Sequence, residues 1–409
     1  MNIKQLRLVY SIHLFLNYLP LGIYFPISTL FLLEKGYSLG WIGTAMSIFS
    51  ITIFLFELPT GGFADKYGRI NIYRISRVIY IFSLLILLFF NTLFSLFFSM
   101  FLYGVARALS SGTMEAWFVD MHDTVDSKIN LSKSMSIVAG VAPAALGIST
   151  LLGGFIPDLK IKMNFFNLQG SYNFNIVIAI SAVLIHLILN IIFFKETKRQ
   201  SHKETINEYC KNIVSFLNQS NSLKYLIAIS FCLGIGLNSI ESFWQPKVQE
   251  LAPNSPTFVL GVLASCYFFA ATVGSLFSNI LTNYLGEKKT LFLMKLFHGI
   301  TLIALSYSAS LVGFSIGFVT IFIFHGALNG PHQTLLHNCI PNQYRSSFLS
   351  VDSLSLQLGG GLSALILGWV AQYNSISLVW KLAGVFIIIS AFLYLPIKQS
   401  KGESCESSI

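Results

Sequence analysis

Charge is what this sequence has least of. Asp, Glu, Lys and Arg together make up 11% of its 409 residues, whereas an ordinary soluble domain has about 25%. So few charges cannot cover a surface that faces water, which excludes a soluble enzyme, a disordered regulator and a nucleic-acid-binding module. The net charge of +9 does not indicate a nucleic-acid partner, because the basic residues stand in short clusters between apolar runs.

Cysteine is also scarce, and a nucleotide-binding loop is missing. The five cysteines show neither a disulfide framework nor metal-ligand spacing, so we predict no metal site. The sequence has no Gly-x-x-x-x-Gly-Lys loop, which argues against ATP hydrolysis as an energy source. We expect no cofactor, and a transmembrane proton gradient as the source of energy. The N-terminus lacks a cleavable signal, so the first apolar run is expected to be a spanning helix.

Long apolar runs are abundant, since 54% of the residues are hydrophobic. A hydrocarbon layer about 30 Å thick needs about 20 apolar residues per helix. Each spanning run has to be helical, because lipid offers the backbone no hydrogen-bond partners. Twelve spans are predicted, at 9–33, 39–63, 74–91, 93–118, 133–157, 173–195, 223–247, 257–283, 290–309, 312–338, 348–373 and 376–397.

The basic residues divide unequally between the two sets of loops. One set holds twenty Lys and Arg residues, among which we count Arg77 and Lys295, and the other set holds five. Loops rich in Lys and Arg stay in the cytoplasm. The bias predicts a multi-pass protein of the cytoplasmic (inner) membrane with both termini in the cytoplasm.

The chain is predicted to consist of two similar halves. A polar stretch at 197–222 indicates a cytoplasmic linker between an N-terminal six-helix bundle, 1–196, and a C-terminal six-helix bundle, 223–409, that ends in a short tail. A weak repeat at an offset of 218 relates Gly43 to Gly261, Gly68 to Gly286, Gly112 to Gly330, and Leu131-Ser132 to Leu349-Ser350. Such repeats are typical of secondary transporters, whose binding sites lie near the midplane.

The most specific motif lies in the loop after the second predicted span. It contains Gly61, Asp65, Lys66, Gly68 and Arg69. Gly68 permits a tight turn that needs positive φ, and the spacing of four lets Asp65 pair with Arg69 if the turn is helical. This segment resembles the signature loop of the major facilitator superfamily, written G-x-x-x-D-[RK]-x-G-[RK].

The resemblance covers essentially the whole chain. It implies an all-α membrane protein with twelve transmembrane helices in two pseudo-symmetric six-helix bundles. The second half has a degenerate copy of the loop, with Asn283 in place of Asp65. In this family the loop's Asp and Arg form a charge cluster with an acidic residue at the cytoplasmic end of span four, which is Asp120 here. The resemblance therefore implies that Asp65, Arg69 and Asp120 are gating residues.

Polar side chains inside the predicted spans are candidate site residues, because ionisable groups are costly at membrane depth. Spans one, four, seven and ten, which line the central cavity in the resembled family, hold most of them. Arg107, Ser111 and Glu115 are spaced by four and would share one face of a continuous helix. The candidates for the substrate or proton pathway are Asn17, Tyr24, Glu57, Arg107, Ser111, Glu115, Asn238, Glu241, His325, Asn329, His332 and Gln333.

Glu115 and Glu241 are the predicted proton carriers. A carboxyl group in low-dielectric surroundings binds a proton more readily than one in water. Two alternatives stay open, namely that Glu115 pairs with Arg107 and that Glu241 lies hydrated near the outer interface. Glu57 precedes Pro59 and has a structural alternative as a helix-end residue.

These features predict a secondary active transporter that moves a small amphipathic organic compound by alternating access, with proton-coupled efflux by antiport. The 37 Phe and 17 Tyr residues suggest an aromatic cavity wall, and the stretch at 111–117 resembles bacterial drug and metabolite exporters. The expected partners are a small-molecule substrate and membrane lipid, without nucleic acid, and the protein is expected to be a monomer. Alternatives are an exporter or importer of a siderophore-like natural product and, more distantly, a polytopic membrane transferase that uses His122 and Asp123.

Overall fold

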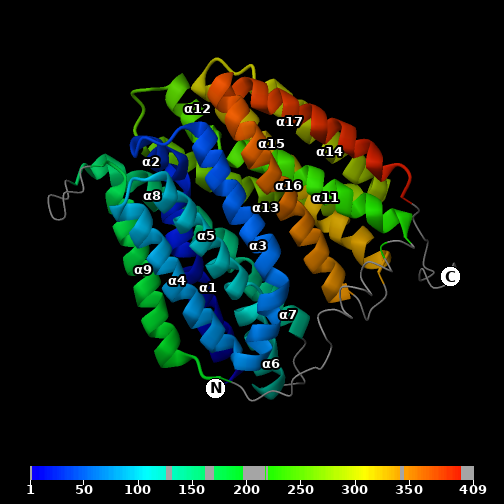
Figure 1. The fold of residues 1–409 in the computed structure, drawn as a ribbon. Coiled ribbons are helices and arrows are strands. Elements are labelled where there is room, and N and C mark those ends of the chain that lie inside the picture. Colours follow the sequence, from blue (N-terminus) through cyan, green and yellow to red (C-terminus); the bar gives the residue numbers. More distant parts are fainter. Residues whose placement is uncertain are drawn as a thin grey trace. The chain divides into compact units, whose positions relative to one another are not determined.

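The structure is a computed structural model that describes residues 2–125, 131–161, 170–196, 217, 220–340 and 345–397, and these residues form helices and short connections without a strand (Figure 1). The elements are α1 (Ile3–Tyr24), η1 (Phe25–Ile27), α2 (Ser28–Glu34), α3 (Leu39–Tyr67), α4 (Arg69–Phe89), α5 (Leu93–Ser110), α6 (Thr113–Val125), α7 (Leu131–Ala139), α8 (Val141–Phe155), η2 (Ile156–Leu159), α9 (Asn173–Phe193), α11 (Asn221–Glu241), α12 (Trp244–Leu251), α13 (Phe258–Leu285), α14 (Glu287–Leu305), α15 (Leu311–Asn338), α16 (Arg345–Tyr373), α17 (Ile376–Ala391) and η5 (Phe392–Tyr394).

The helices occupy the positions of the predicted spans. Eleven helical segments among the described residues are long and apolar enough to cross a membrane. Several of them join consecutive helices, as in α5 with α6 and α11 with α12. Helix α14 stands at the position of the ninth predicted span and carries Lys288, Lys289 and Lys295, and it falls outside the eleven. The predicted all-α, multi-pass architecture is confirmed.

The chain divides into two compact units. The first contains Met1–Tyr37, Ile51–His202 and Asn254–Phe268, and the second contains Ser38–Ser50, Lys203–Pro253 and Phe269–Ile409. Helices α3 and α13 therefore each contribute one segment to either unit. Most of the predicted linker, 197–222, lies outside the described residues; its end forms the start of α11.

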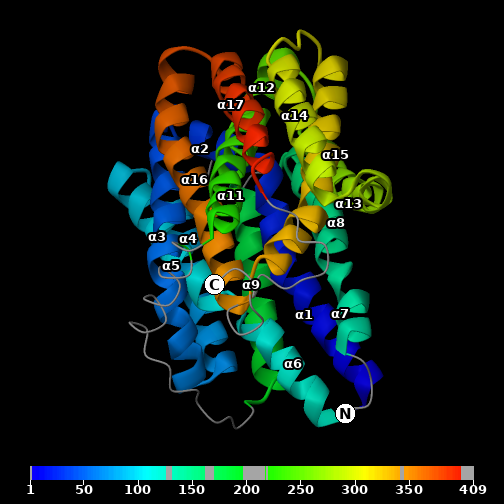
Figure 2. The ribbon, with the colours of Figure 1, turned by 90° about the vertical axis from the view of Figure 1, so that its right-hand side faces the viewer.

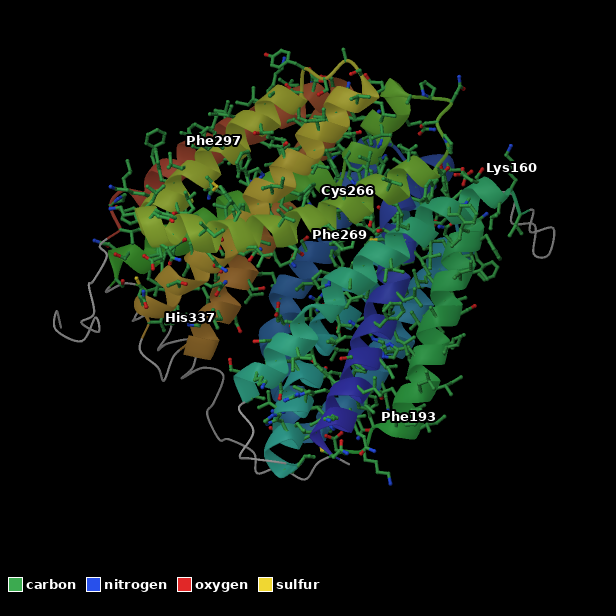
Figure 3. The ribbon with its side chains drawn as sticks, turned by 180° about the vertical axis from the view of Figure 1, so that it is seen from behind. Lys160, Phe193, Cys266, Phe269, Phe297 and His337 are labelled. Carbon is green, nitrogen blue, oxygen red and sulfur yellow. The ribbon has the colours of Figure 1, made fainter. Side chains whose placement is uncertain are left out.

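In the first unit, α1 packs against α8 and α9, and α4 packs against α5 and α9. A core of aromatic and aliphatic residues that includes Tyr10, Trp117 and Phe118 fills the space between α1, α4 and α6. Lys160 and Phe193 lie at opposite ends of this unit (Figure 3).

In the second unit, α11 lies along α16 and also contacts α17, while α14 packs between α15 and α17 (Figure 2). A glycine makes the first of these contacts possible. A Cβ atom at Gly234 would lie 2.0 Å from the carbonyl oxygen of Leu356, so the backbones of α11 and α16 approach each other more closely than any larger residue allows.

The fourth span is not one continuous helix, contrary to the sequence analysis. Helix α5 ends at Ser110, α6 begins at Thr113, and Gly112 between them has a φ of +65°. Periodicity alone does not reveal such a break, because a left-handed glycine redirects the chain without changing its hydropathy. Arg107 and Glu115 consequently lie on separate helices and do not share one helical face.

Several basic residues that were counted in loops lie inside helices, and two of them, Arg77 and Lys295, are buried. Helix α4 begins at Arg69 rather than at residue 74, and α14 begins at Glu287 rather than at residue 290. Arg77 and Lys295 are therefore about two turns into their helices; Arg77 is 7% exposed and Lys295 is 0% exposed. Their loop assignment is wrong, because both residues already fall inside the predicted spans 74–91 and 290–309 and the helices begin earlier still.

Candidate functional sites

The structure joins two of the predicted gating residues. Arg69, the first residue of α4, forms an ion pair with Asp120 of α6, with Nη1 2.8 Å from Oδ2. Gly68 between α3 and α4 has a φ of +94°, which fits the predicted tight turn. Gly61, Asp65 and Lys66 fall in α3, but their side-chain surroundings lie outside the described set.

Glu196 is a further residue at the start of α4, and it was not predicted from the sequence. Its Oε1 accepts a hydrogen bond from the backbone nitrogen of Arg69 at 3.0 Å, and its Oε2 accepts one from Ile70 at 3.1 Å. The carboxylate thus caps the N-terminus of α4, where the helix dipole favours negative charge. A Cβ atom at Gly68 would lie 2.6 Å from Glu196 Oε2, so the absence of a side chain there leaves room for the cap. Gly68 has no side chain that could cap α4, and this was the only indication in the sequence that a distant residue caps the helix.

Asn17 lies in a buried polar group of the first unit. Its Oδ1 accepts hydrogen bonds from the Tyr73 hydroxyl at 2.9 Å and from Arg77 Nη1 at 3.0 Å. The Arg77 guanidinium also lies over the rings of Tyr73 and Tyr80. Among the described side chains Arg77 has no acidic partner, so an amide and two aromatic rings hold this buried cation.

Other predicted residues of the first unit fall at separate places. Tyr24 is buried, and its hydroxyl has no hydrogen-bond partner among the described residues. Glu57 accepts a hydrogen bond from Ser111 at 2.9 Å. Arg107 and Glu115 are exposed, and the described side chains show no ion pair between them. The predicted Arg107–Ser111–Glu115 stripe is therefore wrong as one face of a continuous helix.

The residues predicted in span seven lie near the end of α11. Asn238 accepts a hydrogen bond from Ser242 at 3.4 Å, and Glu241 is the last residue of the helix. Both side chains are partly exposed. Asn329 and Gln333 on α15 are exposed and partly exposed, whereas His325 on the same helix is buried, with its ring centroid 6.0 Å from that of His298 on α14.

His332 belongs to a buried group that we call the Asp352 cluster, which consists of Ser230, Lys295, His332, Asp352 and Tyr394. His332 Nε2 lies 3.2 Å from Asp352 Oδ1, and Ser230 donates a hydrogen bond to the same oxygen. The Tyr394 hydroxyl lies 3.3 Å from His332 Nδ1. Lys295 donates to the carbonyl oxygen of Ile229 at 3.0 Å and lies over the Tyr394 ring.

The sequence analysis recognised only His332 in this cluster. It placed Lys295 in a loop and did not consider Asp352, which lies near the start of the eleventh predicted span. The signal was present, because an acidic residue within an apolar helix is itself a candidate for function. The pairing with His332 was not visible, because it depends on how α15 and α16 pack.

Two further helix starts are capped by side chains that are distant in the sequence. In the first unit, the Asp158 carboxylate accepts hydrogen bonds from the backbone nitrogens of Thr257 at 2.9 Å and Phe258 at 2.8 Å. In the second unit, Gln372 Oε1 accepts one from Leu39 at 3.0 Å. Leu39, the first residue of α3, and Thr257, which precedes the first residue of α13, are related by the repeat offset of 218.

Glycines that the repeat relates lie just beyond these caps. A Cβ atom at Gly43 would lie 2.2 Å from the carbonyl oxygen of Ala364 on α16. One at Gly261 would lie 2.7 Å from that of Thr150 on α8. In each unit, a glycine near the start of one helix therefore allows backbone contact with another helix.

Comparison with known proteins supports the assignment from residues. The profile of the Major Facilitator Superfamily matches residues 11–258 and 249–407. The chain is 22% identical over 96% of both chains to an uncharacterized MFS-type transporter, YxaM, of Bacillus subtilis (strain 168). It is 23% identical to Multidrug resistance protein 2 of the same organism, over 98% of this chain and 97% of the relative.

Among solved structures, the nucleoside transporter NupG superposes with a TM-score of 0.78 over 97% of this chain and 100% of the other, at 14% identity. At that identity the likeness shows the fold alone, and it agrees with the helical architecture described above.

Proposed function

The chain belongs to the Major Facilitator Superfamily, and from this premise we propose that it exports a small amphipathic organic compound in exchange for protons. The family and the fold are those of transporters rather than of enzymes. A transporter of this family carries a small molecule across a membrane in which its helices are embedded. The substrate class, the direction and the proton coupling are our proposal, as are the inner membrane, the cytoplasmic termini and the monomeric state.

One observation carries the proposed direction. The likeness to Multidrug resistance protein 2 extends over nearly the full length of both chains, so it includes both halves and the regions that would bind a substrate. The sequence composition agrees with an amphipathic substrate, because aromatic residues are many and charges are few. A lipophilic aromatic cation fits such surroundings through apolar and cation–π contacts.

The proposed mechanism is alternating access. The Arg69–Asp120 ion pair with the Glu196 cap, at the predicted cytoplasmic end, and the Asp158 and Gln372 caps, at the other end, are the contacts that would form and break in turn. Each of them joins the start of one helix to a side chain of another segment, so its loss would free that helix start to move.

Transport of ethidium, a lipophilic aromatic cation, tests the proposal. Cells that produce the protein should accumulate less ethidium than cells that lack it, and a protonophore should abolish the difference, because the gradient supplies the energy. Purified protein in liposomes should move ethidium against its gradient when a pH difference is imposed. Equal accumulation with and without the protein, over a panel of amphipathic cations and neutral compounds, would contradict efflux of this class.

A further inference from the structure

The Asp352 cluster is buried inside the second unit, away from the ends of its helices. At a rise of about 1.5 Å per residue, Asp352 lies about 10 Å from the start of α16, and Lys295 lies about 12 Å from the start of α14. Asp352 is 7% exposed. A carboxylate and an ammonium group are thus both held in the interior of the second unit, where each costs several kcal/mol unless it is compensated.

The polar and charged groups near Asp352 come from α11, α14, α15 and η5. Ser230 of α11 and His332 of α15 contact its carboxylate directly, and Tyr394 of η5 contacts His332. Lys295 of α14 acts on Asp352 electrostatically without a direct ion pair. Two further titratable groups lie near Lys295, namely the thiol of Cys232 and the imidazole of His298, whose two ring nitrogens have no hydrogen-bond partner in the described part of the chain.

The hydrogen bonds leave one carboxylate oxygen available. Ser230 and His332 both contact Oδ1, and Oδ2 has no hydrogen bond to a described residue. His332 Nε2 lies 3.2 Å from Asp352 Oδ1 and 3.1 Å from the Ser230 hydroxyl, and Nδ1 lies 3.3 Å from the Tyr394 hydroxyl. When Lys295 is charged and His332 is neutral, the cluster has no net charge with Asp352 ionised and a charge of about +1 with Asp352 protonated.

We propose that Asp352 is the group that carries the coupling proton, with Lys295 as its countercharge and Ser230 and His332 as positioning residues. This rests on the proposed proton-coupled transport. A proton from water on the outer side forms the O–H bond at Oδ2, and that bond breaks when the proton passes to cytoplasmic water. Protonation removes the charge that attracts Lys295 and the His332 and Ser230 donors, so it weakens the ties of α16 to α14, α15 and α11.

Comparison of the two repeat-related halves supports proton coupling in the second half alone. Lys295 and Arg77 differ by the offset of 218, so both halves hold a buried cation at the same place in their third helices. Arg77 faces a neutral amide and aromatic rings, whereas Lys295 faces an acid. Among the described residues, only the second unit has a buried carboxylate near its repeat-related buried cation. Asp352 is therefore a better candidate for the proton carrier than Glu115, which is exposed, or Glu241, which is partly exposed.

The experiment compares Asp352→Asn, the double variant Asp352→Asn with Lys295→Met, and Glu250→Gln as a matched control on an exposed carboxylate. Each is reconstituted and assayed for ethidium transport driven by a pH difference and for ethidium exchange at equal pH. The double variant removes both charges, which often leaves folding intact where removal of one does not. We expect the two Asp352 variants to lose gradient-driven transport and to retain exchange, and the control to keep both.

The outcomes separate this proposal from the proposed function. If the wild-type protein shows neither activity, efflux of this class is refuted irrespective of Asp352. If the wild type is active and the double variant retains gradient-driven transport, the assignment of the proton to Asp352 is overturned. It is also overturned if Glu241→Gln loses coupling while Asp352→Asn keeps it, or if both Asp352 variants fail to fold, because the cluster would then be structural.

Discussion

At the scale of single residues, the strongest contacts join helix ends to side chains distant in sequence. Glu196 caps α4 across 127 residues, and Asp158 caps α13 across 99. Neither pairing follows from spacing, because a local cap is sought within about three residues of the helix start. The residue types were informative nevertheless, since a carboxylate beside an uncapped helix N-terminus is stabilised by the unpaired backbone N–H groups.

The cap at α4 predicts a measurable effect on stability. Glu196→Ala removes the acceptor of two backbone N–H groups and should lower the free energy of unfolding by about 1–2 kcal/mol, the usual contribution of a side-chain cap. Thermal unfolding in detergent measures the effect. Glu250→Ala serves as the control, since the Glu250 side chain is exposed, although its partner Lys247 is buried, and its loss should change stability by about 1 kcal/mol or less. Equal shifts for both variants would argue that Glu196 does not cap the helix in solution.

At the scale of elements, the existence of each helix was predictable and its interruptions were not. Hydropathy located the fourth span correctly, but Gly112 divides it and separates Arg107 from Glu115. A glycine within an apolar run is ambiguous, because it can serve close packing in a continuous helix or adopt a left-handed conformation. Helix starts were also misplaced, and Arg77 and Lys295 were counted with the loops although both are buried inside helices.

The two caps at the starts of α3 and α13 should differ in strength. Asp158 is charged and accepts two backbone hydrogen bonds, whereas Gln372 is neutral and accepts one. Charge-assisted hydrogen bonds are roughly twice as strong as neutral ones, so Asp158→Ala should lower the melting temperature more than Gln372→Ala. Unfolding of the two variants in the same detergent measures the difference. A larger effect of Gln372→Ala would show that charge at the helix N-terminus does not dominate these contacts.

At the scale of the whole molecule, the fold was the most predictable property. Length, apolar runs, loop charge and a repeat at one offset act together to specify a two-half helical transporter, and each of these signals is independent of the others. The Asp352 cluster was not predictable in the same way, since it requires side chains from α11, α14, α15, α16 and η5 to meet. Sequence patterns report the faces of single helices but not which faces of different helices pack together.

The repeat itself can be tested through Gly43 and Gly261. Because a side chain at either position would collide with a backbone carbonyl group, Gly43→Val and Gly261→Val should each separate the paired helices near the capped ends and favour the state that is open on that side. A single cysteine in place of Phe25, whose ring lies 5.7 Å from those of Tyr267 and Phe268, reports this opening by its reaction with an impermeant maleimide in a cysteine-free background.

We expect both valine variants to raise the rate of maleimide labelling, and the double variant to raise it further. Gly140→Val is the matched control, because Gly140 has an ordinary φ of −71° and open space around its Cβ position, so labelling should stay at the wild-type rate. If the labelling rate rises for only one of the two valine variants, the two repeat-related glycine contacts do not have the same role.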